Sequence, residues 1–481
     1  RRKKTVVAVR DPFGIKPLYM ARRGSLTMFS SEVRPFARVI SLNEDPVALS
    51  ELLMFRFAAG RLSNFEGVQK VPGGTVLTLS LIDGTLLERR FEDPLDTLMP
   101  DEDMAYPEAL DMAQEAIAKS VRGHLQSDVG YSLQLSGGVD SSLVAAIAAD
   151  LSTQELNSYG VKLEDGSYDE GKYRSMVLNR HSLNHREVSL SGYDFAEAMP
   201  LAVKHMEGPV PHAGCVMLML LCRKIKESSK VVLTGEGADE LFGGYKRYGL
   251  WRDLRRKGQL ANLVPGIIWP LLSRYKEVQK YAGRDPAIYA SVFHDLIELQ
   301  KVFPDLVLMP GRREEAASRF SDFRYRMLAV DQSSYLESLL MRQDKMAMAA
   351  SVEARVPFTH LPLAKVINRI PHKYLVPGNE TKPLLKAVAE AYLPQKVIYR
   401  RKIGLNLPLD SWAADSGGLG RYLDYLMSGD SRLAGYADRK RFVACVDDFY
   451  RGREGKTLPI PHMINLELWL RSVPGSRFLT Q

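Results

Sequence analysis

A short run of glycines and serines constrains the fold of this chain more than any other feature of the sequence. Residues 131–135 (YSLQL) alternate larger apolar and polar side chains, which predicts a short strand, and residues 142–151 predict a helix. The sequence SGGVDSS lies between them, at positions 136–142. Glycines allow the backbone to approach a bound anion closely, and the free N–H groups of a helix start attract negative charge. The pattern therefore predicts a strand, an anion-binding loop and a helix in succession.

The order of the predicted elements around this loop indicates an α/β fold. Further strands are predicted at residues 157–161 and 230–234, with helical segments between them, and the pattern is mainly helical beyond residue 250. Alternation of strand and helix favours a doubly wound parallel sheet with helices on both faces. The second strand ends in another glycine-rich loop, and ligands bind at this end of such strands. We expect both loops to lie at one ligand site.

The acidic residues of the two loops predict a cation between protein and phosphate. The first loop lacks the lysine of the common phosphate-binding loop and carries Asp140 instead. A carboxylate beside phosphates requires a divalent cation between them, and Mg²⁺ is the natural choice. The second loop holds Glu236, Asp239 and Glu240. We expect Asp239 to be the second Mg²⁺ ligand, and Glu236 to stabilise an attacking amine or to take its proton. A plain helix-capping turn would explain Glu240 but would leave the glycines without a role.

These two loops carry a family resemblance. The first resembles the pyrophosphate loop of the ATP pyrophosphatases, and residues 231–245 (VVLTGEGADELFGGY) closely resemble the signature of the asparagine synthetase family. The resemblance implies cleavage of Mg-ATP between its α and β phosphates. It also implies a set of residues that contact ATP or pyrophosphate: Leu135, Ser136, Gly137, Gly138, Asp140, Ser141, Ser142, Val161, Thr234 and Gly235.

Later segments match the same family in order. Residues 163–170 resemble the segment that contacts adenine, and residues 399–404 resemble a late basic loop. The resemblance places Lys402 beside the α-phosphate, as a catalytic residue together with Glu236. Residues 342–346 and 353–358 resemble a helix and the turn that follows it. These two segments supply the predicted substrate-binding residues: Arg342, Lys345, Glu353 and Arg355. A structural ion pair is the competing interpretation for the last two.

The first part of the chain resembles the second half of the glutaminase (Ntn-type, α+β) domain of this family. Residues 10–19, 30–33 and 71–74 carry this likeness, and residues 1–92 alternate short strand-like runs with turns. The family's glutaminase uses an amino-terminal cysteine as its nucleophile. The first cysteine here is Cys215, so we expect no glutamine hydrolysis by this chain. Residues 93–106, acidic and rich in proline, predict a linker, and residues 107–481 predict the ATP-pyrophosphatase synthetase domain.

The resemblance implies that aspartate and ammonia are the substrates and asparagine the product, through β-aspartyl-AMP. Two further enzyme classes stay open: a cyclising synthetase of the β-lactam type, and an amidotransferase that acts on another carboxylate. A nucleotide-binding scaffold without chemistry and an RNA-modifying pyrophosphatase are the remaining alternatives. Pyrophosphate release with aspartate would distinguish the first interpretation from all of these.

Composition adds expectations about partners and compartment. The chain of 481 residues has a formal net charge of +8, without a basic-and-aromatic RNA motif, so no nucleic-acid partner is expected. The longest apolar runs are shorter than a membrane span, so no membrane partner is expected either. Three cysteines give no disulfide framework and favour the cytoplasm. A second copy of the chain, in a homodimer, is the one macromolecular partner considered.

Overall fold

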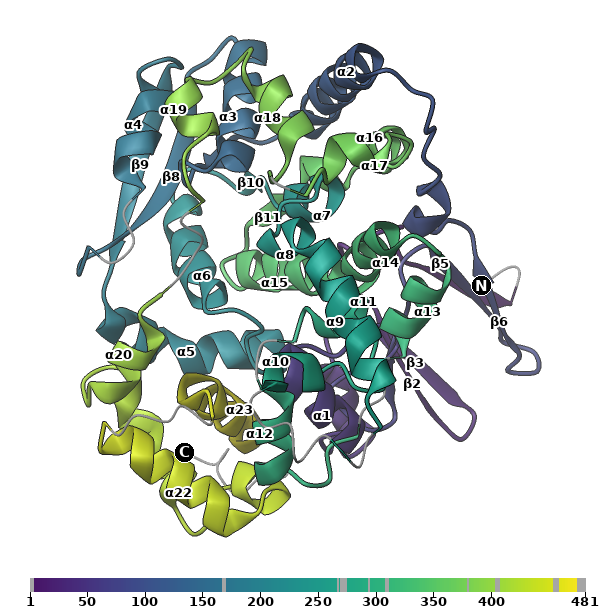
Figure 1. The fold of residues 1–481 in the computed structure, drawn as a ribbon, viewed down its shortest axis with the longest axis vertical. Helices are drawn as coiled ribbons and strands as arrows, with labels where there is room; N and C mark the ends of the chain where they lie inside the picture. Colours follow the sequence, from purple (N-terminus) through teal and green to yellow (C-terminus); the bar gives the residue numbers. More distant parts are fainter. Residues whose placement is uncertain are drawn as a thin grey trace.

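The computed structural model describes residues 4–473, except 167–169, 266–267, 269–274, 293–294, 308–310, 379, 403–406 and 453–457. Figure 1 shows a parallel sheet in the upper part, a group of carboxyl-terminal helices below it, and the amino-terminal strands at one side. Two predicted site segments fall partly outside the described residues. They are the adenine-contacting segment at residues 167–169 and the late basic loop at residues 403–406.

The main sheet has five parallel strands, which confirms the predicted α/β class. Its strands are β7 (Tyr131–Gln134), β8 (Leu156–Leu163), β9 (Leu183–Leu190), β10 (Val231–Leu233) and β11 (Glu353–Arg355). Their order in the sheet is β11-β10-β7-β8-β9. The direction of winding therefore reverses between β7 and β10. Because parallel crossovers are right-handed, this reversal puts the first and the later helices on opposite faces.

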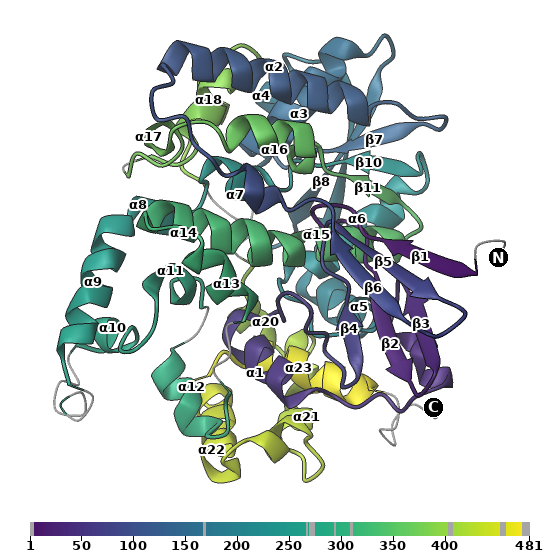
Figure 2. The same cartoon turned by 90° about the vertical axis from the view of Figure 1, so that its right-hand side faces the viewer.

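Helices cover both faces of this sheet (Figure 2). The first group consists of α2 (Tyr106–His124), α3 (Val139–Leu151), α4 (Gly171–Leu178), α5 (Gly192–Met206) and α6 (Gly214–Ile225). Helices α2 and α4 pack on α3, whereas α6 packs on β8, β9 and α5. Along α2, Ala109, Ala113, Ile117 and Val121 recur at helical spacing and are buried, so one face of this helix packs on the protein.

Helix α3 begins at Val139, three residues before the predicted start. Gly138 is extended (φ −75°, ψ 155°), and its carbonyl accepts the N–H of Ser142 at 3.0 Å. Asp140 and Ser141 therefore belong to the first helical turn and not to the loop. The sequence pattern missed this because it located the helix from its apolar face, which starts only after the serines.

A long helical region follows β10. It contains α7 (Ala238–Phe242), α8 (Lys246–Gly249), α9 (Trp251–Leu263), α10 (Lys276–Gln279), α11 (Pro286–Tyr289), α12 (Leu296–Val302), α13 (Arg312–Ser318), α14 (Phe323–Val330) and α15 (Leu336–Met348). After β11 come α16 (Leu361–Ile367), α17 (His372–Leu375), α18 (Pro383–Ala389), α19 (Gln395–Ile398), α20 (Leu409–Ala414), α21 (Leu423–Met427), α22 (Arg439–Tyr450) and α23 (Ile460–Ser472). Within the described ranges, no helix combines the length and the apolar character needed to cross a membrane.

The amino-terminal part, which we call the front domain, holds two antiparallel sheets of three strands. Its elements are β1 (Thr5–Val9), β2 (Tyr19–Arg23), β3 (Leu26–Ser30), α1 (Pro46–Phe55), β4 (Val68–Lys70), β5 (Thr75–Ser80) and β6 (Leu86–Arg90). The sheet orders are β1-β5-β6 and β3-β2-β4. A turn at Asp83-Gly84 connects β5 to β6, and Gly84 adopts a positive φ of 74°.

Helix α15 joins the front domain to the rest of the molecule. Glu337 near its start accepts an ion pair from Arg10 at 3.2 Å, and Asp344 near its end pairs with Lys16 at 2.6 Å. Tyr19 donates to the sulfur of Met341 between them, at 3.8 Å. These contacts recur at helical spacing, so one face of α15 faces the front domain along its length.

The predicted linker, residues 93–106, packs against this body. Leu95 and Leu98 are buried in a cluster with Ala316, Tyr325 and Ala329 of the α13–α14 region. A segment with apolar side chains buried in this way is held in place by packing, and it fixes the path of the chain between the front domain and α2.

Candidate active site

The two glycine-rich loops meet where the winding of the sheet reverses. One follows β7 and the other follows β10, and these strands are hydrogen-bonded neighbours. A Cβ atom built on Gly235 would lie 2.6 Å from the backbone nitrogen of Ser141 and 2.7 Å from the carbonyl carbon of Asp140. Only glycine permits this approach. Crevices at such reversal points are the usual ligand sites of doubly wound folds.

Hydrogen bonds of its own serines stabilise the first loop. The Oγ atoms of Ser136 and Ser141 lie 2.9 Å apart, and the N–H of Gly138 donates to Ser136 Oγ at 3.1 Å. Gly137 has φ +94°, a conformation that favours glycine. Among the described atoms, Ser142 Oγ is buried without a hydrogen-bond partner. A phosphate oxygen would satisfy this hydroxyl, so the loop fits the anion that the sequence predicts.

One lysine forms an ion pair with each of the two predicted metal ligands. Lys382 Nζ lies 2.6 Å from Asp140 Oδ2 and 2.6 Å from Asp239 Oδ1. Lys402 Nζ lies 2.8 Å from both carboxylate oxygens of Asp239. Burial alone would raise the pKa of Asp239, but Lys382 and Lys402 hold it well below its usual range. Asp239 is therefore ionised near neutral pH, and it shares one cationic neighbour, Lys382, with Asp140. This donor set suits Mg²⁺ beside phosphate oxygens.

Lys382 is a functional candidate that the sequence analysis missed. Burial would lower its pKa, but Asp140 and Asp239 raise it, so it stays charged. Lys382 has φ +52°, a rare conformation for a side-chain-bearing residue, immediately before Pro383 of α18. A Cβ on Gly244 would lie 1.8 Å from Asp239 Oδ1 and 2.1 Å from Lys382 Cε. The paired glycines of the second loop were therefore the available signal that a bulky ion pair occupies this space.

Glu236, the predicted partner of the amine, is held by Arg342 of α15. The Arg342 Nη2 atom contacts Glu236 Oε2, and both side chains are largely buried. Burial would lower the pKa of Arg342, but Glu236 raises it. The structure thus brings Arg342 to the site, where it contacts a predicted catalytic carboxylate.

Glu240 differs from the other two acids of its loop. It is fully buried and receives a hydrogen bond from the hydroxyl of Tyr245. Burial, with the nearby Asp239 and Glu236, raises the pKa of Glu240 to about 8. At neutral pH this carboxyl is therefore mostly neutral, which removes one of the three charges that would otherwise repel each other.

A cavity of about 90 Å³ adjoins the first loop. It lies between the ends of β7 and β8 and helix α6. Leu135, Ser136 and Val161 line it, together with Met217 and Leu221. Its largely apolar wall next to the phosphate-type loop suits a flat nucleobase, as the prediction for Val161 requires.

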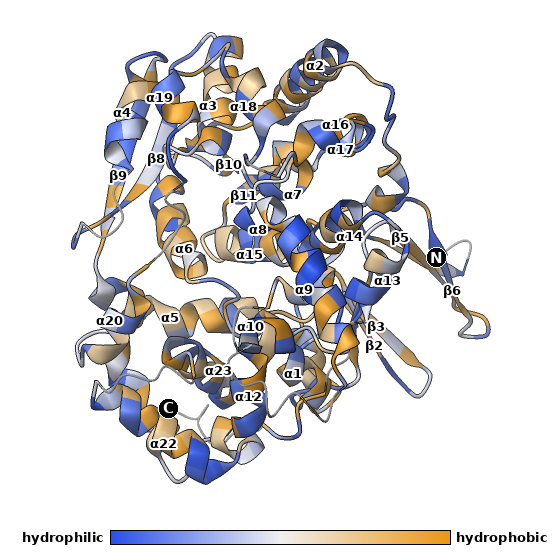
Figure 3. Ribbon diagram, viewed as in Figure 1, coloured by the Kyte–Doolittle hydropathy of each residue, from blue (hydrophilic) through white to orange (hydrophobic). Residues whose placement is uncertain are grey.

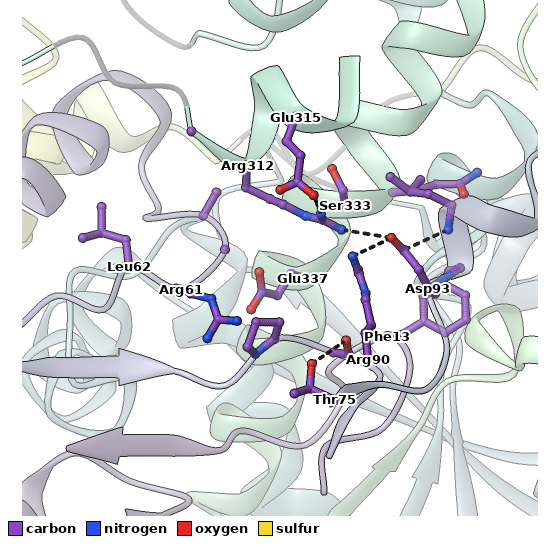
Figure 4. Close-up of a pocket in the computed structure, with 18 of the residues that line it drawn as sticks. Phe13, Arg61, Leu62, Thr75, Arg90, Asp93, Arg312, Glu315, Ser333 and Glu337 are labelled. Carbon is purple, nitrogen blue, oxygen red and sulfur yellow. Dashed lines mark hydrogen bonds and ion pairs between the residues drawn. The ribbon is translucent and has the colours of Figure 1, made fainter. Parts of the chain in front are cut away.

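The largest described cavity, about 510 Å³, lies elsewhere (Figure 4). It is formed where the front domain meets α13 and α15. Arg90 and Arg312 converge there on Asp93, at 2.7 and 3.7 Å, so its charges are neutralised internally. We place the chemistry at the smaller site because the carboxylates, glycine loops and lysines converge there and not at the larger cavity.

The remaining predicted residues divide between the site and its surroundings. Lys345 is buried against the carboxylate of Glu207 at 2.7 Å and is not part of the Asp140–Asp239 cluster. Arg355 pairs with Glu353 at 2.9 Å and also donates to the carbonyl of His124, which corresponds to the structural ion pair considered above. These three residues are not brought to the carboxylate cluster. Thr234 is buried directly before Gly235, and its N–H donates to the carbonyl of Arg355.

Arg400, from the late basic loop, does reach the first loop. It pairs with Glu170 and its guanidinium lies 4.6 Å from the ring centre of Tyr173. A Cβ on Gly138 would lie 3.7 Å from Arg400 Nη2. The basic loop and the first loop are therefore adjacent, although they are more than 250 residues apart in the sequence.

The strand order and the paired loops together define a doubly wound α/β domain of the ATP-pyrophosphatase type. Comparison with known proteins agrees with this class. The family model "Asparagine synthase" matches residues 112–471, and a model of the "Glutamine amidotransferase domain" matches residues 1–91. The chain therefore belongs to the asparagine synthase family, with part of an amidotransferase domain in front, as the sequence resemblance predicted.

Individual relatives are similar at low identity. The chain is 28% identical over 424 residues to asparagine synthetase [glutamine-hydrolyzing] 1 of Bacillus subtilis, covering 84% of this chain and 66% of that protein. It is 25% identical over 480 residues to asparagine synthetase [glutamine-hydrolyzing] 3 of the same organism, covering 96% and 73%. The amidase chyE of Penicillium rubens is 24% identical over 475 residues, covering 86% and 66%. The chain thus spans about two thirds to three quarters of these relatives.

Proposed function

We propose that this chain is an ATP-dependent amide-forming synthetase that adenylates the side-chain carboxylate of aspartate and transfers ammonia to it. The observation that carries the proposal is the convergence of Asp140 and Asp239 on Lys382, beside a glycine-rich loop in which the buried Ser142 hydroxyl has no hydrogen-bond partner among the described residues. A site with two carboxylates and a lysine suits a polyphosphate bound together with a divalent cation. Family membership favours ATP as that polyphosphate.

In the first step, an oxygen of the aspartate side chain forms a bond to the α-phosphorus of ATP, and the bond to the β-phosphate breaks. Ser136, Ser141 and the loop N–H groups would hold the departing pyrophosphate. Lys402, which contacts Asp239 at 2.8 Å and is half-exposed, would neutralise charge that develops on the α-phosphate. Asp140 and Asp239 would hold Mg²⁺, whose contribution when bound is to offset the phosphate charge.

In the second step, ammonia attacks the carbonyl carbon of the acyl adenylate, and AMP leaves. The nitrogen becomes positively charged as it bonds, and it must lose a proton. Glu236 is the carboxylate suited to stabilise that charge and accept the proton, with Arg342 fixing its orientation. The product amide is asparagine when aspartate is the acceptor.

The direct test is pyrophosphate release from Mg-ATP with aspartate, using either ammonium or glutamine as nitrogen donor. We expect pyrophosphate, AMP and asparagine in equal amounts with ammonium. Asp140→Ala should abolish pyrophosphate release while the far-ultraviolet circular dichroism stays that of the unchanged protein. Normal turnover by Asp140→Ala would rule out this site. Absence of turnover with aspartate, together with turnover on another carboxylate, would assign the chain to the alternative acceptor class.

A further inference from the structure

The positive charge of this chain is concentrated in one segment. Residues 246–284, which we call the arm, hold ten Lys or Arg and two Asp or Glu, so their formal charge is +8. The rest of the chain holds 55 residues of each sign, so its formal charge is zero. The whole net charge of the protein therefore resides in the arm, which contains α8, α9 and α10. Charge concentrated in this way affects which partners a protein attracts, and it does not determine the fold.

The inner face of α9 packs on the protein. Leu254 and Ala261 are buried, and a Cβ on Gly258 would lie 2.4 Å from the ring of Pro286. Helix α9 is thus packed against α11. In Figure 2, α9 and α10 lie at the edge of the molecule, on the side away from the β1–β3 strands. Their outer surface is accordingly presented to the surroundings.

The outer face of α9 combines unpaired positive charge with exposed leucines. Arg252, Arg255 and Arg256 are exposed, and none of them forms an ion pair with any described residue. Leu260 is 55% exposed and Leu263 is 77% exposed. Figure 3 shows the hydrophilic colour of much of α9. Positions 252, 256, 260 and 263 recur at helical spacing, so arginines and leucines form one stripe along the helix.

Three other basic residues of the arm form ion pairs within the protein, unlike the arginines of the stripe. Arg247 pairs with the buried carboxylate of Asp331 at 2.6 Å. Lys257 pairs with Asp253 at 3.1 Å, and Lys280 pairs with Glu277 at 3.2 Å. Both acidic residues of the arm are therefore already engaged by lysines. The three arginines of α9 keep their charge available for an anionic partner.

We propose that the outer face of α9 docks the protein on an anionic lipid surface. Arginines attract lipid phosphates, and leucines at one end of the same face enter the boundary between headgroups and acyl chains. A nucleic acid would use the arginines but would gain nothing from two largely exposed leucines. The proposal departs from the sequence expectation that the chain has no membrane partner, which considered spanning segments and dispersed charge only.

The test is co-sedimentation of the full chain with vesicles of phosphatidylcholine alone or mixed with phosphatidylglycerol. We expect binding to the mixed vesicles only, and loss of binding as salt is raised. The variant Arg252→Glu/Arg255→Glu/Arg256→Glu should bind at least about a hundredfold more weakly, because each basic residue near such a surface contributes roughly fivefold. Leu260→Ser/Leu263→Ser, which keeps the charge, should also weaken binding, by about tenfold or more.

A matched control separates this surface from general charge effects. Arg439→Glu/Lys440→Glu/Arg441→Glu makes the same charge change at three exposed residues of α22 and should bind as the unchanged protein does. If the triple arginine variant does not fold by circular dichroism, Arg252→Gln/Arg256→Gln replaces it, with a loss of at least about tenfold expected. Three results would each overturn the proposal: no binding to the mixed vesicles, equal loss in the α22 control, or full binding by the leucine variant. Full binding by the leucine variant, together with displacement of the vesicles by duplex DNA, would assign this face to nucleic acid.

Discussion

The ammonium nitrogen of Lys382 lies 2.6 Å from both carboxylate oxygens of Asp140, although the two residues are 242 positions apart in the chain. Lys382 approaches from the segment before α18, and Asp140 from the first turn of α3. A single pair of side chains thereby connects the loop region of the parallel sheet to the helices that follow β11. It also ties the stability of the fold to the geometry of the proposed site.

Replacing Lys382 should therefore cost stability as well as activity. Lys382→Met leaves two carboxylates facing each other without their shared cation, and we expect a loss of about 3 kcal/mol in the free energy of unfolding. Urea denaturation would measure it. Asp140→Asn/Lys382→Met should recover part of that loss, because one of the unpaired charges is then absent. Equal stability of Lys382→Met and the unchanged chain would show that the pair does not hold the loops together.

Gly235 is predicted to be irreplaceable for activity. Gly235→Ala puts a methyl group 2.6 Å from the backbone nitrogen of Ser141, so the two loops must separate. We expect pyrophosphate release to fall by about a hundredfold, since misplaced catalytic groups lose orientation. Gly123→Ala is the matched control, because a Cβ there meets no atom within 4 Å inside helix α2. If both variants kept full activity, the close contact between the loops would have no catalytic importance.

Glu236 and Arg342 are predicted to affect the second half-reaction more than the first. Glu236→Gln removes the proton acceptor, so we expect amide formation to slow by about 10²–10⁴-fold. Exchange of labelled pyrophosphate into ATP with aspartate should change by less than about tenfold, because adenylation precedes the amine step. Arg342→Lys should be closer to the unchanged protein than Arg342→Ala, since lysine can still pair with Glu236. An equal fall in exchange and amide formation would place Glu236 in adenylation instead.

His372 should make the protein sensitive to mild acid. Burial, together with the nearby Arg324, lowers the pKa of His372 to about 3, whereas the unfolded chain titrates near 6.5. Below pH 6.5 the unfolded state binds a proton that the folded state does not. The contribution of neutral His372 to the free energy of unfolding is therefore complete above pH 6.5. It declines as the pH falls, and the loss is about 2 kcal/mol at pH 5.

The measurement is the thermal midpoint at pH 7 and at pH 5. His372→Phe keeps a ring against Tyr325, whose centre lies 4.7 Å from that of His372, and removes the titrating group. Its midpoint should fall less between the two pH values than that of the unchanged chain. The same fall in both proteins would assign the acid sensitivity to other groups.

Much of the fold was accessible from local signals in the sequence. The alternating run at residues 131–135 and the glycines at 137, 138, 235 and 237 specify strands and special backbone geometry within a few residues, so β7, β10 and their loops were predicted. The predicted start of α3 was wrong by three residues. The helix begins at Val139 because the extended Gly138 precedes it, and no capping side chain marks that boundary. Strand order was not accessible, since pairing depends on contacts between distant segments.

The composition of the site was less predictable than its location. The loops placed Asp140, Glu236 and Asp239 together because each follows a neighbouring strand end. Lys382 carried no local signal, and only the folded chain brings it 2.6 Å from Asp140. Lys345 lies in a segment that matches the family, yet its side chain turns to Glu207 and away from the carboxylate cluster. A motif specifies which helix is present, whereas the direction of each side chain on that helix depends on packing.

The face of α15 that meets the front domain determines how small a piece of this chain can fold. Glu337 and Asp344 are largely buried, and the arginine and lysine that pair with them come from the first sixteen residues. A polypeptide cut at the predicted boundary near residue 107 would keep both carboxylates but lose their counter-charges, and it would expose Met341 to water. The same helix carries Arg342 to Glu236. The smallest cooperative folding unit is therefore wider than the synthase domain defined by sequence, and preparations that omit the front domain should yield a protein in which Glu236 is poorly ordered.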